Sequence, residues 1–278
     1  MKKLLLFSFF LCCFYIHLSA QELFTYTEPA SNMAKGTLGF RLNSTLMKDE
    51  VELENNLQII PEVMLGISKK WMIHLEGFLS DRGLVTDRNN TLIAEGGSLY
   101  LKYRFYSIDE VHSHFRMAAF SRISINNSDV HQEAIDLNGH NSGYEMGFVA
   151  TKLQHKIALS ASLSLLHALD NKNEIDYRFP SKNRDAINYT FSLGKLLLPK
   201  TYKDYNQTNM NGMLEILCQT NINTGKTYVD AAPVLQFIFL SKMRADISYR
   251  FPLSNDLYRS ASKGFLLRLE YNVFNAIK

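Results

Sequence analysis

Segments in which apolar and polar residues alternate recur along most of this chain. In residues 157–165, Ile157, Leu159 and Leu163 fall on odd positions, while the even positions hold one alanine and three serines. Successive side chains of a β-strand point to opposite faces, so this spacing gives the strand one apolar face and one polar face. A helix would not use this period, and the pattern therefore predicts a protein built from β-strands.

Twelve such segments can be identified, at residues 36–44, 62–68, 71–79, 97–106, 115–125, 144–150, 157–165, 187–193, 214–220, 233–239, 245–251 and 265–273. Their connections alternate between tight turns, such as residues 68–71 and 154–156, and long polar stretches, such as residues 126–142 and 169–185. Residues 200–209 are an exception, since they form a long connection on the side of the tight turns. An even strand number, short periplasmic turns and long outer loops are typical of bacterial outer-membrane barrels.

A soluble β-sandwich also has strands with one apolar face, so alternation alone does not separate it from a membrane barrel. The segments have about 9–11 residues, the length of a tilted membrane span, and aromatic residues are frequent at their ends, as in interfacial girdles. Their polar face carries many charges, which a sandwich core would exclude. In lipid every backbone group must be paired, so the sheet has to close. We therefore predict an all-β protein, a closed antiparallel up-and-down transmembrane β-barrel of about 12 strands.

The first twenty residues have the features of a secretory signal peptide. Two lysines precede an apolar run, and the small Ala20 ends it, so we expect cleavage after this residue. The run is shorter than the ~20 residues of a spanning helix, and an uncleaved membrane anchor is the alternative. We assign residues 1–20 to the signal peptide, residues 21–35 to an N-terminal periplasmic segment or plug, and residues 36–278 to the barrel.

Removal of the signal peptide changes the charge and the cysteine count of the chain. Two of the 30 Lys and Arg residues are lost, which leaves 28 against 27 Asp and Glu and a net charge of +1. This balance provides no basic excess for nucleic acid, which we do not expect as a partner. Cys218 is the one cysteine left, so no intrachain disulfide can form.

Alternation also assigns a set of charged and titratable side chains to the inner face of the barrel. They are Arg41, Glu62, His74, Glu76, Lys102, Arg104, Arg116, Arg122, Glu145, Glu215, Arg244, Asp246, Arg250, Arg268 and Glu270. One interpretation is a wall of ion pairs that fills the lumen and stiffens the barrel.

The inner face is unevenly filled, because two neighbouring segments contribute only small side chains. These are Ala158, Ser160, Ser162, Ser164, Asn188, Thr190, Ser192 and Gly194. The opposite wall is bulky and contributes the cations Lys102, Arg104, Arg116 and Arg122. We predict a narrow off-centre passage between the two walls, lined by a ring that favours anions or polar solutes, unless residues 21–35 plug it. The lumen-lining candidates are Arg41, Glu62, Glu76, Lys102, Arg104, Arg116, Arg122, Ser160, Ser162, Ser164, Arg244, Arg250 and Arg268.

The long connection at residues 126–142 combines residue types that bind divalent metals. They are His131, Glu133, Asp136 and His140. Their spacing matches no ligand signature, and polar loops collect such residues, so we expect neither a metal nor a cofactor.

Three stretches carry a resemblance to a known family, namely QELFTYTEPASNMAKGTLGFRLN, EGGSLYLKYRFYSIDEVHSHFRMAAFSR and LNGHNSGYEMG. The chain resembles a largely uncharacterised Bacteroidetes-type family of outer-membrane β-barrels. That family is loosely similar to transporter-like barrels associated with phenol-degradation pathways. The resemblance implies a barrel in the bacterial outer membrane and brings no catalytic residue with it.

We therefore expect a channel-like or transporter-like barrel that passes small polar or anionic solutes and is not an enzyme. Its other partners would be outer-membrane lipid and the barrel-insertion machinery, since the last segment ends in alternating apolar residues and Phe274.

Two alternatives stay open. The first is a lipid-modifying hydrolase, because outer-membrane phospholipases are similar barrels that use a His and a Ser two residues apart. His140 and Ser142 would lie on the same face of the sheet as Tyr144, which is the lipid-facing side. No asparagine at a matching outward position completes a triad, however. The second is a structural or adhesive barrel with a closed lumen.

Overall fold

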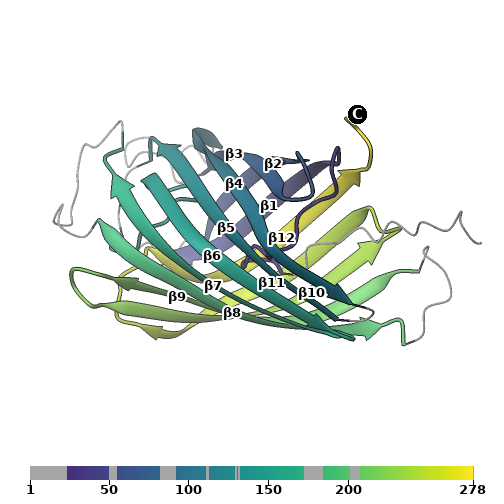
Figure 1. Ribbon diagram of the computed structural model, residues 1–278. Helices are drawn as coiled ribbons and strands as arrows, with labels where there is room; N and C mark the ends of the chain where they lie inside the picture. The colour runs from purple at the N-terminus through teal and green to yellow at the C-terminus, as the bar shows by residue number, and fades with distance from the viewer. Residues whose placement is uncertain are drawn as a thin grey trace, which may run out of the picture.

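The computed structural model shows a barrel of antiparallel β-strands (Figure 1). It describes residues 24–49, 55–81, 92–110, 113–128, 130, 132–171, 184–200 and 207–277. The expected signal peptide and His131 lie outside these residues. Within the described ranges, no helix is long and apolar enough to cross a membrane.

Twelve strands make up the barrel, and their bounds are β1 (Leu38–Asp49), β2 (Asn55–Gly66), β3 (Trp71–Ser80), β4 (Ile93–Glu110), β5 (Ser113–Asn126), β6 (Ser142–Gln154), β7 (Ile157–Leu169), β8 (Asp185–Leu198), β9 (Asn209–Asn221), β10 (Thr227–Phe239), β11 (Met243–Asn255) and β12 (Ala261–Val273). Each predicted segment overlaps one strand. The strands run from 10 residues in β3 to 18 in β4, mostly longer than the predicted spans, because pairing continues where the alternation fades. In β4 a bulge between Arg104 and Tyr106 shifts the alternation, so the sequence pattern does not reveal the end of the strand.

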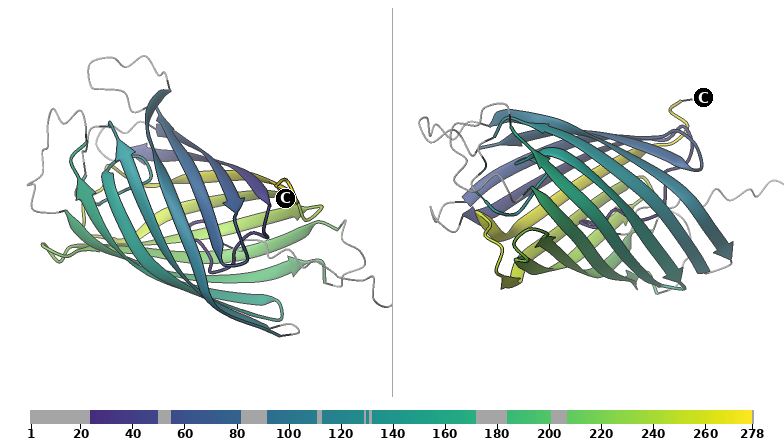
Figure 2. Two further views of the ribbon diagram at one scale, coloured as in Figure 1. Left: turned by 45° about the horizontal axis from the view of Figure 1, so that its top comes forward. Right: turned by 60° about the vertical axis from the view of Figure 1, so that its left-hand side comes forward.

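The sheet closes on itself, which confirms the predicted fold class. Each strand pairs with its neighbours in the sequence, and β1 pairs with β12, so no edge is left open. Phe40, for example, lies opposite Tyr271 in this closing pair. The views in Figure 2 show the strands tilted around one axis, as closure requires.

The two faces of the sheet differ as the alternation predicts. Outward apolar side chains are left uncovered, for example Phe148 with 61% and Leu165 with 59% of its surface exposed. Inward neighbours such as Ser164 and Gly147 are buried. An uncovered apolar band around a polar interior is the arrangement that suits hydrocarbon outside and water inside.

The two ends of the barrel have different connections. At the short-turn end, residues 155–156 and 240–242 join successive strands, and the C-terminal residues lie there as well (Figure 1). Leu240 and Ser241 have positive φ angles of 51° and 55°, a conformation found in tight hairpin turns that match the twist of the strands. At the long-loop end, residues 127–141 connect β5 to β6.

Candidate functional site

Ion pairs connect the inward side chains of β1, β2, β11 and β12. The guanidinium of Arg41 lies 3.1 Å from a carboxylate oxygen of Glu62 and 3.0 Å from one of Glu270. Arg244 continues the series, because its guanidinium lies 3.8 Å from Glu270 and 2.9 Å from Asp246. All five residues are buried. Each charge therefore has a partner of opposite sign, which a buried charge requires.

A second series of ion pairs lies on β3, β5 and β6. Arg122 is 2.7 Å from Glu76 and 3.8 Å from Glu145, and Nδ1 of His74 is 2.5 Å from Glu62. Ligand atoms of Glu62, His74 and Glu76 lie within 4.8 Å of one another, a spacing that a metal ion would fit. Because both glutamates already bind guanidinium groups, the geometry favours ion pairing. We call the two series together the charged wall.

Small hydroxyl and amide side chains line β7 and β8. This small-residue wall consists of Ser160, Ser162, Ser164, Asn188, Thr190 and Ser192. Ser162 and Thr190 lie 2.6 Å apart across the two strands, and Ser164 donates to Glu145 of the charged wall over 2.6 Å. Such short side chains reach only their nearest neighbours, so they leave room beside them in the lumen.

The N-terminal segment, residues 24–35, occupies that room. The backbone N–H groups of Thr25 and Thr27 donate to the two carboxylate oxygens of Glu215 over 2.7 and 2.8 Å. The N–H of Tyr26, between them, donates to the same carboxylate over 3.0 Å. Glu215 lies on β9 and has no exposed surface. Three successive N–H groups on one carboxylate satisfy a buried charge that has no ion pair in the described residues.

Hydroxyl groups add to this attachment. Ser192 donates to Oγ1 of Thr27 over 2.8 Å, and Thr27 donates to Thr190 over 2.9 Å. Thr25 donates to Asp246 over 2.8 Å. The segment thus contacts the small-residue wall and the end of the charged wall together.

Apolar contacts hold the segment as well. Phe24 is buried against Ala158, Met213 and Val234 on the inner face of β7, β9 and β10. Ala30 has no exposed surface. The small Ala158 and the neighbouring Gly194 give the aromatic ring its space, since a Cβ added at Gly194 would lie 3.4 Å from the ring.

On its other side the N-terminal segment contacts two of the predicted cations. Nζ of Lys102 donates to the carbonyl oxygens of Pro29 and Ser31, each over 2.8 Å, and lies 3.2 Å from Glu28. Arg116 donates to the hydroxyl of Ser31 over 3.0 Å. The segment therefore lies between the small-residue wall and the cations, in the gap that the sequence predicts between them.

The four predicted cations do not form a ring. In the register of β4 and β5, Arg122 lies opposite Tyr100, whereas Arg116 lies opposite Ser107. The cations follow these strands from the middle of the barrel towards the short-turn end, because consecutive inward positions of a strand lie along it rather than around the axis.

Three other candidates have partners in the barrel wall or in a short turn. Arg104 is half-buried and donates to the carbonyl oxygen of Lys69 in a short turn over 2.7 Å. Arg250 lies 2.5 Å from Asp230 towards the long-loop end. Arg268 donates to a side-chain amide oxygen on β1 over 2.6 Å. The structure thus brings only some of the lumen-lining candidates into hydrogen-bond contact with the N-terminal segment.

The loop before β6 folds into the long-loop end of the barrel. We call residues 132–141 the cap loop. The backbone N–H and carbonyl groups of Ile135 bind the side-chain amide of Gln219 on β9, each over 2.8 Å. Ser124 donates to the carbonyl oxygen of Leu137 over 2.6 Å. The lumen is therefore occupied from both ends, by the N-terminal segment and by the cap loop.

This connection lies at the predicted long-loop end, but part of it folds into the barrel. Ala134, Ile135 and Leu137 are buried, and the latter two pack with inward residues of β7 and β8. Their apolar character within a polar stretch was the available signal. Of the metal-ligand candidates in this loop, Glu133 instead pairs with Lys226 over 2.7 Å.

His140 and Ser142 do not face the outer, lipid side that the hydrolase alternative requires, which corrects that expectation. They are 5% and 7% exposed. The hydroxyl of Ser142 accepts from the N–H of Asn126 over 2.8 Å, and Nδ1 of His140 lies 3.3 Å from Asp136. The chain turns into the barrel before β6, so alternation from Tyr144 no longer sets the side of these residues.

Sequence reasoning also missed contacts that involve loop residues. Arg259, in the loop before β12, binds both carboxylate oxygens of Asp230, one of them over 2.8 Å. Its guanidinium lies 3.9 Å from the ring centre of Tyr228. Loops carry no alternation, so no sequence signal placed this arginine inside the barrel.

Comparison with known proteins agrees with this architecture. The chain matches no family model, and no curated protein matches it. Among solved structures, the COG4313 outer-membrane channel from Pseudomonas putida F1 has a TM-score of 0.56 at 12% identity, over 90% of this chain and 99% of that chain. The KdgM porin has a TM-score of 0.50 at 8% identity, over 84% of this chain and 98% of that chain.

At such low identity, these likenesses establish a shared fold. The resemblance to a Bacteroidetes-type family stays a prediction, as do the role of the lumen residues and the assignment of residues 1–20. The chain has the closed all-β barrel fold of a known outer-membrane channel and a known porin.

Proposed function

We propose that this chain is an outer-membrane channel for small polar or anionic solutes, which its N-terminal segment holds closed. An uncovered apolar outer face, a charged interior and loops that are long at one end support this proposal. The fold shared with an outer-membrane channel and a porin supports it as well. Export through a cleaved signal at residues 1–20 and assembly by the barrel-insertion machinery belong to the same proposal.

One observation supports a closed state of the channel. Residues 24–31 belong to no strand, and side chains of the barrel wall, chiefly Glu215 and Lys102, hold their backbone. Water can replace such hydrogen bonds at a net cost of about 0.5–3 kcal/mol each. The barrel ladder is closed without this segment, so the segment can leave while the barrel stays intact.

The solute class follows from the groups that displacement would release. Lys102 would lose Glu28, Pro29 and Ser31, and Arg116 would lose Ser31 while it keeps its ion pair with Asp109. On the other side, Thr190 and Ser192 would lose Thr27 as a partner, and the Glu215 carboxylate would lose its three N–H donors. Cationic donors facing small hydroxyl groups favour anions and polar solutes.

The filled lumen favours a second candidate, a structural or adhesive barrel that never opens. Lys102, Glu215 and Gln236 are inward residues without exposed surface. The cap loop adds to the filling from the other end. A barrel that is permanently packed in this way would act through its outer loops.

Conductance in planar bilayers separates the two candidates. We expect chain 21–278 to be mostly closed, and a variant lacking residues 21–33 to conduct with a preference for anions. Lys102→Met and Arg116→Met in the shortened chain should reduce that preference, because they remove the released charges. If the shortened chain is folded by circular dichroism but does not conduct, the channel proposal is wrong and the structural barrel is supported.

A further inference from the structure

Two apolar grooves lie next to each other on the outer wall, near the short-turn end. The glycine groove, of about 570 Å³, surrounds Gly212 of β9 and is lined by Leu193, Leu235 and Ile247. It exists because Gly212 places no side chain between Lys195 and Leu235, its partners on the neighbouring strands. Its volume lies within the ~300–1,000 Å³ of small-molecule sites.

The alanine groove, of about 430 Å³, lies on the adjoining strands. Ala150 and Ala161 face each other across β6 and β7 and form its floor. Leu193 and Leu214 line both grooves. The two apolar grooves therefore adjoin each other at these side chains.

Each groove has a lysine on its short-turn side. Lys152 lies beside the alanine groove, between Phe115 and Leu159 in the strand register. Lys195 lies beside the glycine groove, opposite Gly212. Both side chains are exposed on the outward face. Neither forms an ion pair with a carboxylate of the described residues.

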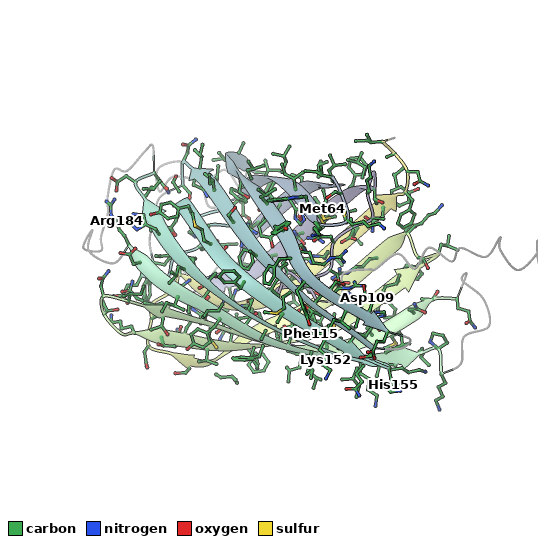
Figure 3. All side chains as sticks on the ribbon, viewed as in Figure 1. Met64, Asp109, Phe115, Lys152, His155 and Arg184 are labelled. Atoms are coloured by element: carbon green, nitrogen blue, oxygen red, sulfur yellow. The ribbon has the colours of Figure 1, made fainter. Side chains whose placement is uncertain are left out.

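More positive charge surrounds these lysines. Lys156, in the turn between β6 and β7, donates to the carbonyl oxygens of Pro199 and Lys200. Figure 3 shows Lys152 and His155 at this end of the barrel, below the outward Phe115. The described part of this region thus combines apolar grooves with a rim of cationic side chains.

We propose that the grooves and their lysines bind an anionic phospholipid of the leaflet at the short-turn end. An acyl chain would lie in the glycine or alanine groove, and the phosphate would bind Lys195 or Lys152. A lysine near the interface can extend its ammonium to the headgroups while its methylene chain stays in the apolar layer. The negative charge of the lipid complements the cationic rim, and each lysine near the surface contributes to that attraction.

This inference rests on the proposed membrane location but not on solute passage. The chain supplies a matched control, because Lys48 and Lys263 are exposed outward lysines that face each other at the long-loop end. They have the same charge and the same membrane-facing direction, and neither lines a groove described here.

Native mass spectrometry of the mature protein, with equal amounts of phosphatidylglycerol and phosphatidylethanolamine, tests the proposal. We expect phosphatidylglycerol to be retained at least about fivefold more, as one lysine–headgroup contact would give. Lys152→Gln with Lys195→Gln should bring this ratio close to one, whereas Lys48→Gln with Lys263→Gln should leave it unchanged. Gly212→Leu should reduce retention of both lipids by filling the glycine groove.

Equal retention of the two lipids by the unmodified protein would overturn the proposal, as would equal losses in the two lysine pairs. A mass showing a second copy of the chain in place of lipid would also overturn it. In the chain that lacks residues 21–33, Lys152→Gln with Lys195→Gln should leave the bilayer conductance unchanged. A failure of lipid binding with normal conductance would therefore leave the channel proposal intact.

Discussion

Buried polar groups need partners, and the charged wall and the small-residue wall provide them in different ways. In the charged wall, buried charges are paired by neighbours in the wall itself. Arg41 lies directly opposite Glu62 on one side and Glu270 on the other. In the small-residue wall and beside it, polar groups such as Ser192 and Glu215 are satisfied by a separate piece of chain. The first wall pairs its charges internally and receives additional contacts from Phe24 and Thr25, while the second depends on the N-terminal segment for its partners.

Side-chain length explains this difference. An arginine on one strand spans the distance to carboxylates on both neighbouring strands, so a pairing register is enough to satisfy it. Ser160 and Ser192 also lie opposite each other, but hydroxyl groups fill little of the lumen. The charged wall forms its pairs within the sheet, and the small-residue wall leaves the space that the N-terminal segment fills.

The largest effect is expected from breaking the charged wall. Arg41→Ala leaves the buried Glu62 and Glu270 without their shared cation, and should lower the free energy of unfolding by about 3–5 kcal/mol. Urea unfolding in micelles, followed by tryptophan fluorescence, measures it. Arg104→Ala is the control, because this half-buried residue bonds only a turn carbonyl in the described contacts. A loss as large in the control would contradict the role given to the ion pairs.

A smaller effect, confined to the N-terminal segment, is expected from Glu215→Gln. The variant loses charge-assisted hydrogen bonds from Thr25 and Thr27, which contribute about 1.5–3 kcal/mol each. Hydrogen exchange of these amides should accelerate roughly 10- to 100-fold, while barrel unfolding changes little. Glu145→Gln removes an inward carboxylate that bonds Ser164 instead, and exchange in residues 25–27 should not respond to it. A similar response to both variants would mean that Glu215 is not the anchor.

The smallest effect is expected from Ser192→Ala. This change removes a hydroxyl that lies 2.8 Å from Oγ1 of Thr27 and 3.1 Å from the Glu215 carboxylate, a contact that contributes about 1 kcal/mol. Exchange at residues 25–27 should then rise only about fivefold. Ser164→Ala, on the same wall but bonded to Glu145, should leave it unchanged. Unchanged exchange in Ser192→Ala would show that the hydroxyl groups add nothing to the attachment made by Glu215.

Much of the barrel could be predicted from the sequence because its main signal is local. Alternation assigns Ser164 inward and Leu165 outward from neighbouring residues alone, and the structure places both as assigned. The signal weakens wherever the period is interrupted. The bulge after Arg104 conceals the end of β4, and the inward turn before Ser142 reverses the predicted side of His140.

The candidate site was less predictable, because its contacts join residues that are distant in the sequence. Glu215 binds Thr25 over a separation of 190 residues, and Gln219 binds Ile135 over 84. Alternation states that a side chain points inward but not which group it meets there.

The sequence by itself determined the strands, their two faces and the need for a closed sheet, since apolar outer faces and charged inner faces leave few other solutions. Only the tertiary structure decided which charges pair, where the cap loop lies and what occupies the lumen. These depend on strand register, on the curvature of the closed sheet and on the size of the remaining space. All three arise only when the whole barrel has formed.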